Sequence, residues 1–108
     1  MEDADAVTRS TRAPRFTWNR HEVAVQLGRI LREAREKLGV SQHELSRRTG
    51  LSQAAISYYE RGASVPSIHV LARLATELMI KLRLDFEEGR VTLVRVVSAQ
   101  ERIERAGV

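Results

Sequence analysis

Apolar residues recur at three- and four-residue spacing through the segment 20–38, which predicts one amphipathic helix. Asn19 stands at the expected N-cap, Glu22 is its capping-box partner, and Gly39 is placed to end the helix. The segment is therefore expected to be the first helix of the domain. Its predicted apolar stripe consists of Val23, Leu27, Ile30, Leu31, Ala34 and Leu38.

Two short helices are predicted next, at about 42–48 and 53–61. Ser41 opens an S-x-x-E capping box for the first of them, and Ser52 caps the second. Gly50 lies in the tight turn between them and is able to take a positive φ. The residues expected to face the core are Leu45, Ile56 and Tyr59.

A fourth helix is predicted at about 67–78, introduced by Pro66 and Ser67. The spacing then changes from a helical period to strict alternation, and a turn signal at 88–90 is followed by a segment rich in β-branched residues at 91–97. This pattern predicts a β-hairpin, so the fold class is mainly α with a C-terminal β-hairpin. The fourth helix has the stripe Ile68, Leu71, Leu74, Ala75 and Leu78, and the first strand has the apolar positions Ile80, Leu82, Leu84 and Phe86.

Composition narrows the class of partner. The chain has a net charge of +4, and almost all of its 18 basic residues are arginine, whose forked guanidinium suits phosphate and guanine. It has no cysteine, which excludes disulfides and thiolate metal sites. No apolar run approaches the roughly 20 residues of a membrane span, and the N-terminus is unlike a secretory signal. We therefore expect an anionic partner, and no membrane.

Two short helices, each with its own N-cap residue and joined by a glycine-containing turn, form the supersecondary unit of helix-turn-helix proteins. Spacing alone leaves open an ordinary helical hairpin inside a small bundle. The residues themselves favour DNA binding. The informative runs are LREAREKLGVSQHEL at 31–45, GLSQAAISYYERG at 50–62, PS at 66–67 and LARLA at 71–75.

These runs closely resemble the Cro/C1 type of helix-turn-helix, also called the Xre family, over about residues 27–78. The resemblance implies a lambda-repressor-like bundle and a bacterial or phage transcription regulator. Here a hairpin pattern replaces the fifth helix, so we expect four helices followed by strands. Similar extensions occur in antitoxins of the HigA and HipB kind, where they form the dimer or contact the toxin.

The expected DNA contacts follow from the recognition helix at 53–61, whose N-terminal residues reach base edges. Gln53 can pair with adenine N6 and N7, and Ala54 can touch a thymine methyl group. Ser57 and Tyr58 lie one turn further along the same face. Gln42 implies a phosphate contact at the start of its helix, as in the family. The other predicted phosphate contacts are Ser52, Arg61, Ser64, Arg47 and Arg48.

Two further sets of residues have predicted structural roles. The resemblance implies a partly buried salt bridge between Arg35 and Glu60 that orients the recognition helix. The apolar face of the first strand, which comprises Ile80, Leu82, Leu84 and Phe86, is the predicted dimer contact. The alternative is that this face packs only on the helices of its own chain.

The sequence thus predicts a homodimeric DNA-binding transcriptional regulator, expected to act as a repressor on a pseudo-palindromic operator of double-stranded DNA. The alternatives are an antitoxin that represses its own operon and holds a toxin, or a protein-interaction module. We expect no enzyme activity, cofactor or metal site, and a bacterial cytoplasmic location. The expected parts are a flexible arm at 1–18, the helix-turn-helix domain at 19–78, the hairpin at 79–98 and a tail at 99–108.

Overall fold

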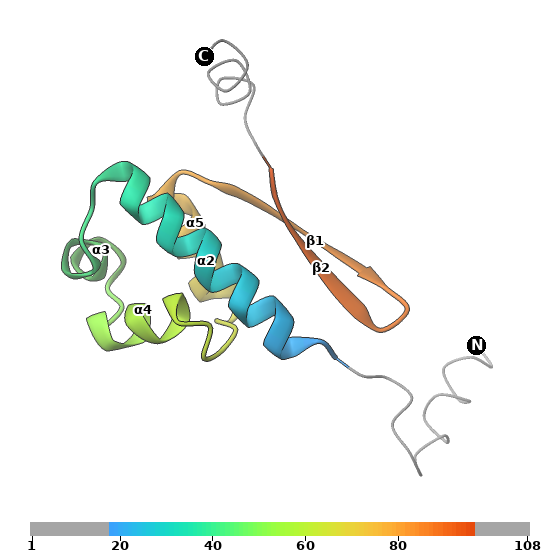
Figure 1. Cartoon of the computed structure of the whole chain (residues 1–108). Helices are drawn as coiled ribbons and strands as arrows, with labels where there is room; N and C mark the ends of the chain where they lie inside the picture. The colour runs from blue at the N-terminus through green and yellow to red at the C-terminus, as the bar shows by residue number, and fades with distance from the viewer. Residues whose placement is uncertain (1–17, 97–108) are drawn as a thin grey trace.

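The computed structural model describes residues 18–96, so most of the expected arm, the last positions of the hairpin segment and the tail lie outside the described residues. Within them the predicted fold class is confirmed: a bundle of helices is followed by an antiparallel hairpin (Figure 1). The elements are α2 (Arg20–Leu38), α3 (Gln42–Thr49), α4 (Gln53–Glu60), α5 (Ile68–Leu78), β1 (Lys81–Glu87) and β2 (Arg90–Val96).

Serine caps set the starts of three helices. The Oγ of Ser41 accepts from the backbone N–H of Glu44, and Ser52 and Ser67 make the same i+3 bond in their own helices. Each bond satisfies one of the N–H groups that a helix leaves unpaired at its first turn. The start of every short helix is therefore fixed by its own sequence.

Asn19 behaves differently, and its predicted capping bond is wrong. Its side chain makes no cap bond to α2. Instead Nδ2 donates to the carbonyl of Val91 and Oδ1 accepts from the N–H of Val91, each at 2.9 Å. An amide side chain matches the donor and acceptor that one strand residue offers at a sheet edge. Asn19 thus ties the start of α2 to β2, and Glu22 adds an ion pair with Arg90 at 2.8 Å.

The hydrophobic core lies between the helices and one face of the hairpin, to which β2 contributes Leu93. Two predicted core positions are wrong. Ile68 is 66% exposed and Leu38 is 40% exposed, because each lies at the end of its helix, where the bundle no longer covers it. The most deeply buried side chains are Leu27, Leu31, Leu45, Ile56 and Leu74.

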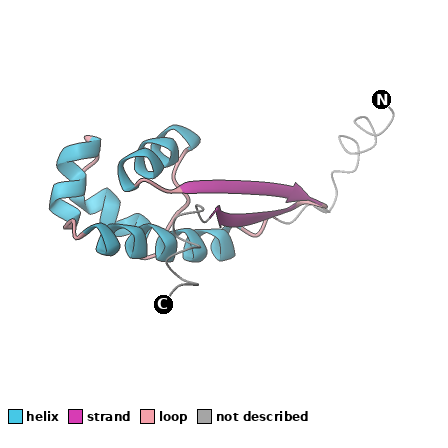
Figure 2. Ribbon diagram, turned by 90° about the horizontal axis from the view of Figure 1, so that it is seen from above, coloured by secondary structure: helices cyan, strands magenta, loops and turns pink. Residues whose placement is uncertain are grey.

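The hairpin turns through two residues, Glu88 and Gly89, both with positive φ. This is the backbone of a type I′ turn, whose twist matches that of the paired strands. The hairpin packs on α2, and its tip points away from α3 and α4 (Figures 1 and 2). The molecule therefore has two ends, one formed by α3 and α4 and the other by the hairpin tip.

α2 and α4 approach each other backbone to backbone at Gly28. A Cβ at this position would lie 2.6 Å from the carbonyl oxygen of Tyr59 and 2.7 Å from that of Glu60. Gly62 belongs to the same close approach, because a Cβ built on it would lie 2.9 Å from the Cα of Val25 in α2. Only glycine allows this approach, which sets the distance between α2 and the end of α4.

We predict that Gly28→Ala lowers the free energy of unfolding by about 1–3 kcal/mol through overlap with rigid backbone. In an ordinary helix interior the same change would raise stability by about 0.5–1 kcal/mol. Urea denaturation measures the difference. Gly39→Ala is the control, since no atom lies within 4 Å of its Cβ and only its φ of 73° opposes the change. A Gly28→Ala protein more stable than wild type would contradict the close approach.

Candidate nucleic-acid interface

The turn between α3 and α4 is held by a small hydrogen-bond network. Gly50 takes the positive φ of 77° that the turn requires. The buried Thr49 hydroxyl donates to the carbonyl of Leu45 and accepts from the N–H of Leu51. Arg73 of α5 donates to the carbonyl of Thr49 at 3.0 Å. The two helices are therefore fixed relative to each other and to the bundle.

Arg35 of α2 and Glu60 of α4 form a two-bond ion pair. The Nε–Oε2 distance is 2.7 Å and the Nη2–Oε1 distance is 3.0 Å. The side chain of Arg35 is 13% exposed and that of Glu60 only 4%. The third arginine donor reaches the carbonyl of Val40 at 2.8 Å, which joins the loop before α3 to the same pair. Hydrogen bonding to Glu60 raises the pKa of Arg35.

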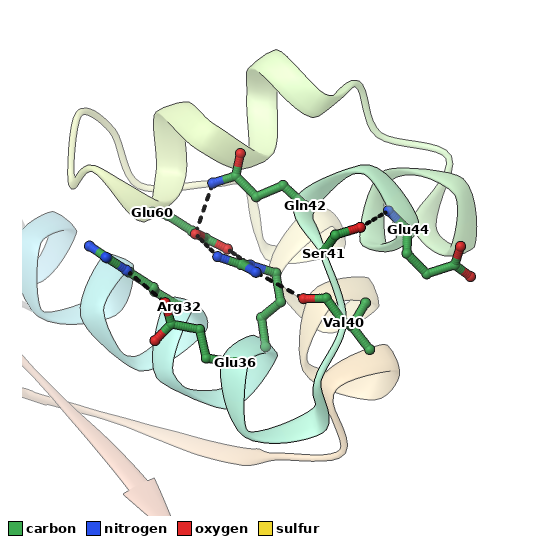
Figure 3. Close-up of polar contacts among 8 residues, drawn as sticks. Arg32, Glu36, Val40, Ser41, Gln42, Glu44 and Glu60 are labelled. Carbon is green, nitrogen blue, oxygen red and sulfur yellow. Dashed lines mark hydrogen bonds and ion pairs between the residues drawn. The ribbon is translucent and has the colours of Figure 1, made fainter.

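Gln42, a predicted phosphate contact, belongs to the same cluster (Figure 3). Its Nε2 donates to Oε1 of Glu60 at 3.0 Å. A side-chain amide nitrogen carries two N–H donors, so one remains for another acceptor. The ion pair thereby fixes the orientation of a side chain at the first position of α3. Sequence spacing alone did not indicate this bond between residues 18 positions apart.

The face of α4 turned away from the bundle carries the predicted base contacts. Gln53 and Ala54 are exposed in its first turn, Ser57 is half-buried, and Tyr58 is 46% exposed. The Tyr58 ring meets the Tyr59 ring edge-on, with 6.3 Å between centroids. These four residues therefore form one continuous surface along a single helix.

The predicted phosphate contacts fall into separate groups. Arg47 and Arg48 are exposed, but both bind the carboxylate of Glu44, at 2.6 and 3.1 Å. Hydrogen bonding from Arg48 lowers the pKa of Glu44. The Oγ of Ser52 is used by its helix cap, and Arg61 donates to the Ser57 hydroxyl at the other end of α4. Arg47 and Arg48 at the end of α3, and Arg61 at the end of α4, therefore each have a hydrogen-bond partner within the chain.

A polar hollow beside α4 includes residues that the sequence did not single out. Ser64 and Tyr58 line it together with Arg20 and His21 from the first turn of α2. Both α2 residues are exposed. Their spacing in the sequence gives no signal, because they join this surface only through the packing of α2 against α4. They extend the basic part of the interface beyond the two central helices.

The predicted dimer contact is split by the structure. Ile80, Leu82 and Leu84 are half-buried and pack against the core of their own chain. Phe86 is 74% exposed. The face is therefore covered at one end of β1 and open at the other.

Among residues 18–96, no helix is both long and apolar enough to cross a membrane. The same residues contain no group of three or more histidine, cysteine or acidic side chains arranged to hold a metal ion.

A capped two-helix unit with an exposed second helix defines the helix-turn-helix class, and comparison with known proteins agrees. The helix-turn-helix family profile matches residues 31–83. The chain is similar to the solved restriction-modification controller protein C.AhdI from Aeromonas hydrophila, at 35% identity and a TM-score of 0.53, over 56% of this chain and 91% of that one. This chain therefore belongs to the helix-turn-helix family of the Cro/C1 type.

Two curated relatives match over shorter shares of their length. Multiprotein-bridging factor 1 of Candida albicans is 32% identical over 62 residues, which are 57% of this chain and 41% of that protein. The HTH-type transcriptional regulator y4dL of Sinorhizobium fredii is 44% identical over 54 residues, which are 50% and 28%. The chain thus spans less than half the length of these relatives.

We predict that Glu60→Met lowers the free energy of unfolding by about 3–5 kcal/mol, because it leaves the Arg35 guanidinium buried without its counter-ion. Adding Arg35→Met should recover most of that loss, since replacing a whole buried pair by apolar side chains is often neutral. Thermal and urea denaturation of both proteins measure this. Losses that simply add in the double variant would contradict a coupled pair.

Proposed function

We propose that the chain regulates transcription as a homodimer that binds double-stranded DNA, with α4 as the recognition helix. The observation that carries this proposal is the exposure of Gln53 and Ala54 in the first turn of α4. The C-terminal end of that helix is fixed to the bundle by the ion pair of Arg35 and Glu60. A rigidly held helix with a polar, unobstructed N-terminal turn suits insertion into the major groove.

The chemistry of this face fits base reading. The Gln53 amide offers a donor and an acceptor side by side, which match adenine N7 and N6. The Ala54 methyl group fits against the methyl group of a neighbouring thymine. Ser57 and Tyr58 extend the contact surface by one helical turn. In this proposal the face reads a few base pairs.

Phosphate contacts position the helix over its half-site. Gln42 uses its free N–H for one phosphate while Glu60 holds the amide in place. Arg61 and Ser64 contact phosphates of the DNA strand that passes the end of α4, where Arg20 and His21 lie close by. Arg47 and Arg48 both bind Glu44, so one of them must leave that carboxylate to contact a phosphate. Ser52 contacts a phosphate through its backbone at the start of α4, because its hydroxyl caps the helix.

A single helix reads too few bases for a specific site. Two copies related by a two-fold axis bind half-sites about one turn of DNA apart, which makes the operator pseudo-palindromic. By occupying such an operator the dimer acts as a repressor. The proteins similar to this chain include one named as a controller and one named as a transcriptional regulator. An antitoxin would bind DNA through the same residues and would also bind a toxin protein.

Fluorescence anisotropy with a duplex from the chain's own promoter tests this function. Wild-type protein should bind the promoter duplex more tightly than a scrambled one, and affinity should fall steeply as salt rises. Gln53→Ala should weaken promoter binding by about 5- to 150-fold through loss of a bidentate base contact. It should leave binding to the scrambled duplex unchanged.

Gln26→Ala is the matched control, since it removes the same amide from α2, away from the proposed base-reading face. It should bind like wild type. Equal weak binding of both duplexes, unaffected by Gln53→Ala, would overturn the proposal and favour a protein-interaction module.

A further inference from the structure

β1 is the outer strand of the hairpin. It pairs with β2 along one edge, and among residues 18–96 no backbone group is hydrogen bonded along its other edge. An unpaired strand edge is a template for another strand. The edge of β2 differs, because the side chain of Asn19 occupies its donor and acceptor at Val91.

The register shows which residues offer their backbone groups at the open edge. Val91 directs its N–H and C=O to Asn19, away from β1, and its partner across the hairpin is Phe86. Such a pair is non-hydrogen-bonded, so Phe86 directs its own N–H and C=O away from β2. The pattern alternates, so Leu84 and Leu82 do the same. Three residues therefore present free donors and acceptors at this edge.

The same three residues leave apolar surface uncovered. Leu82 and Leu84 are half-buried and line a groove with Ile68, Leu71, Ala72 and Ala75 of α5. Phe86 is 74% exposed and Ile68 is 66% exposed. An apolar side chain that entered from the open edge would cover Phe86. The edge therefore offers both hydrogen bonds and apolar contact.

The charges of β1 show what fits there. Its sequence, KLRLDFE, is self-complementary about Leu84 when it is paired antiparallel with a copy of itself. Arg83 then faces the partner's Asp85, and Lys81 faces the partner's Glu87. Opposite charges directly across a strand pair stabilise it, and like charges destabilise it.

This register is selected by charge as well as by hydrogen bonding. A pairing centred on Leu82 places Lys81 opposite the partner's Arg83. A pairing centred on Phe86 places Asp85 opposite the partner's Glu87. Both put like charges together, and centres on Arg83 or Asp85 do the same, because each of these residues then faces its own copy. Leu84 is the centre that combines outward-pointing backbone groups at the axis with opposite charges on either side of it.

We propose that two copies of this chain join through β1, antiparallel and two-fold symmetric about Leu84, into a four-stranded sheet of order β2-β1-β1-β2. Leu84 packs beside the partner's Leu84, and Phe86 beside the partner's Leu82. The two-fold axis is normal to the sheet, so both helical domains lie on the same side of it. This inference rests on the homodimer of the proposed function and specifies its interface.

Charge reversal tests the register. Arg83→Asp alone and Asp85→Arg alone each create two like-charge contacts in a homodimer, so the dimer dissociation constant should rise at least about tenfold. An equimolar mixture of the two variants restores opposite charges at both contacts. The mixture should therefore form a heterodimer nearly as tight as the wild-type dimer. Sedimentation velocity without DNA measures all three samples.

Arg29→Asp is the control, because it makes the same change of charge on an exposed position of α2 and should sediment as wild type. A monomeric wild-type chain, single variants that dimerise normally, or a mixture that fails to associate would each overturn the proposed interface. Misfolding cannot imitate rescue by mixing. Since no DNA is present, failure of DNA recognition would leave this result unaffected, and failure of the interface would leave Gln53→Ala informative.

Discussion

The buried ion pair between Arg35 and Glu60 is the interaction on which the interface depends. It joins α2 to the end of α4, and through the carbonyl of Val40 and the amide of Gln42 it also reaches the start of α3. Removing two charges from water costs much of what their attraction returns. The pair therefore adds little to the free energy of unfolding, and its main effect is to orient the segments that it joins. It fixes three segments with directional bonds that apolar packing cannot supply.

The close contact at Gly28 makes this geometry possible. A side chain there would push α4 away from α2 and lengthen the ion-pair distances. The glycine weakens α2 as an isolated helix, and the loss is offset by the contacts that the approach permits. Packing at the centre of the bundle and placement of the recognition face at its surface thus share one constraint.

Local signals in the sequence predicted the elements well. The serine caps and the glycine of the turn between α3 and α4 act within a few residues, so Ser41, Ser52 and Gly50 lie where their chemistry predicts. Contacts between residues far apart in the sequence could not be predicted in this way. Asn19 has the sequence of a cap but binds Val91, 72 positions away, because the hairpin edge offers a matched donor and acceptor. The bond of Gln42 to Glu60, and the place of Arg20 beside Ser64, likewise arise only from tertiary packing.

The two ends of the molecule have different tasks in this account. The end formed by α3 and α4 lies away from the tip of the hairpin (Figure 2). The first end carries exposed polar side chains such as Gln53, while the hairpin has an open edge along which apolar and charged residues alternate. One end suits the grooves of DNA and the other suits a second copy. Their separation lets each be altered without loss of the other.

The central claim is that the buried pair positions the interface rather than stabilising the fold. The most direct measurement is the DNA affinity of the Arg35→Met, Glu60→Met double variant, with and without Gln42→Ala. In the wild-type background Gln42→Ala should weaken binding by roughly threefold to tenfold, the worth of a typical hydrogen bond. The folded double variant should already bind weakly, and Gln42→Ala should then add little. Wild-type affinity in the double variant, with an undiminished Gln42→Ala effect, would contradict the claim.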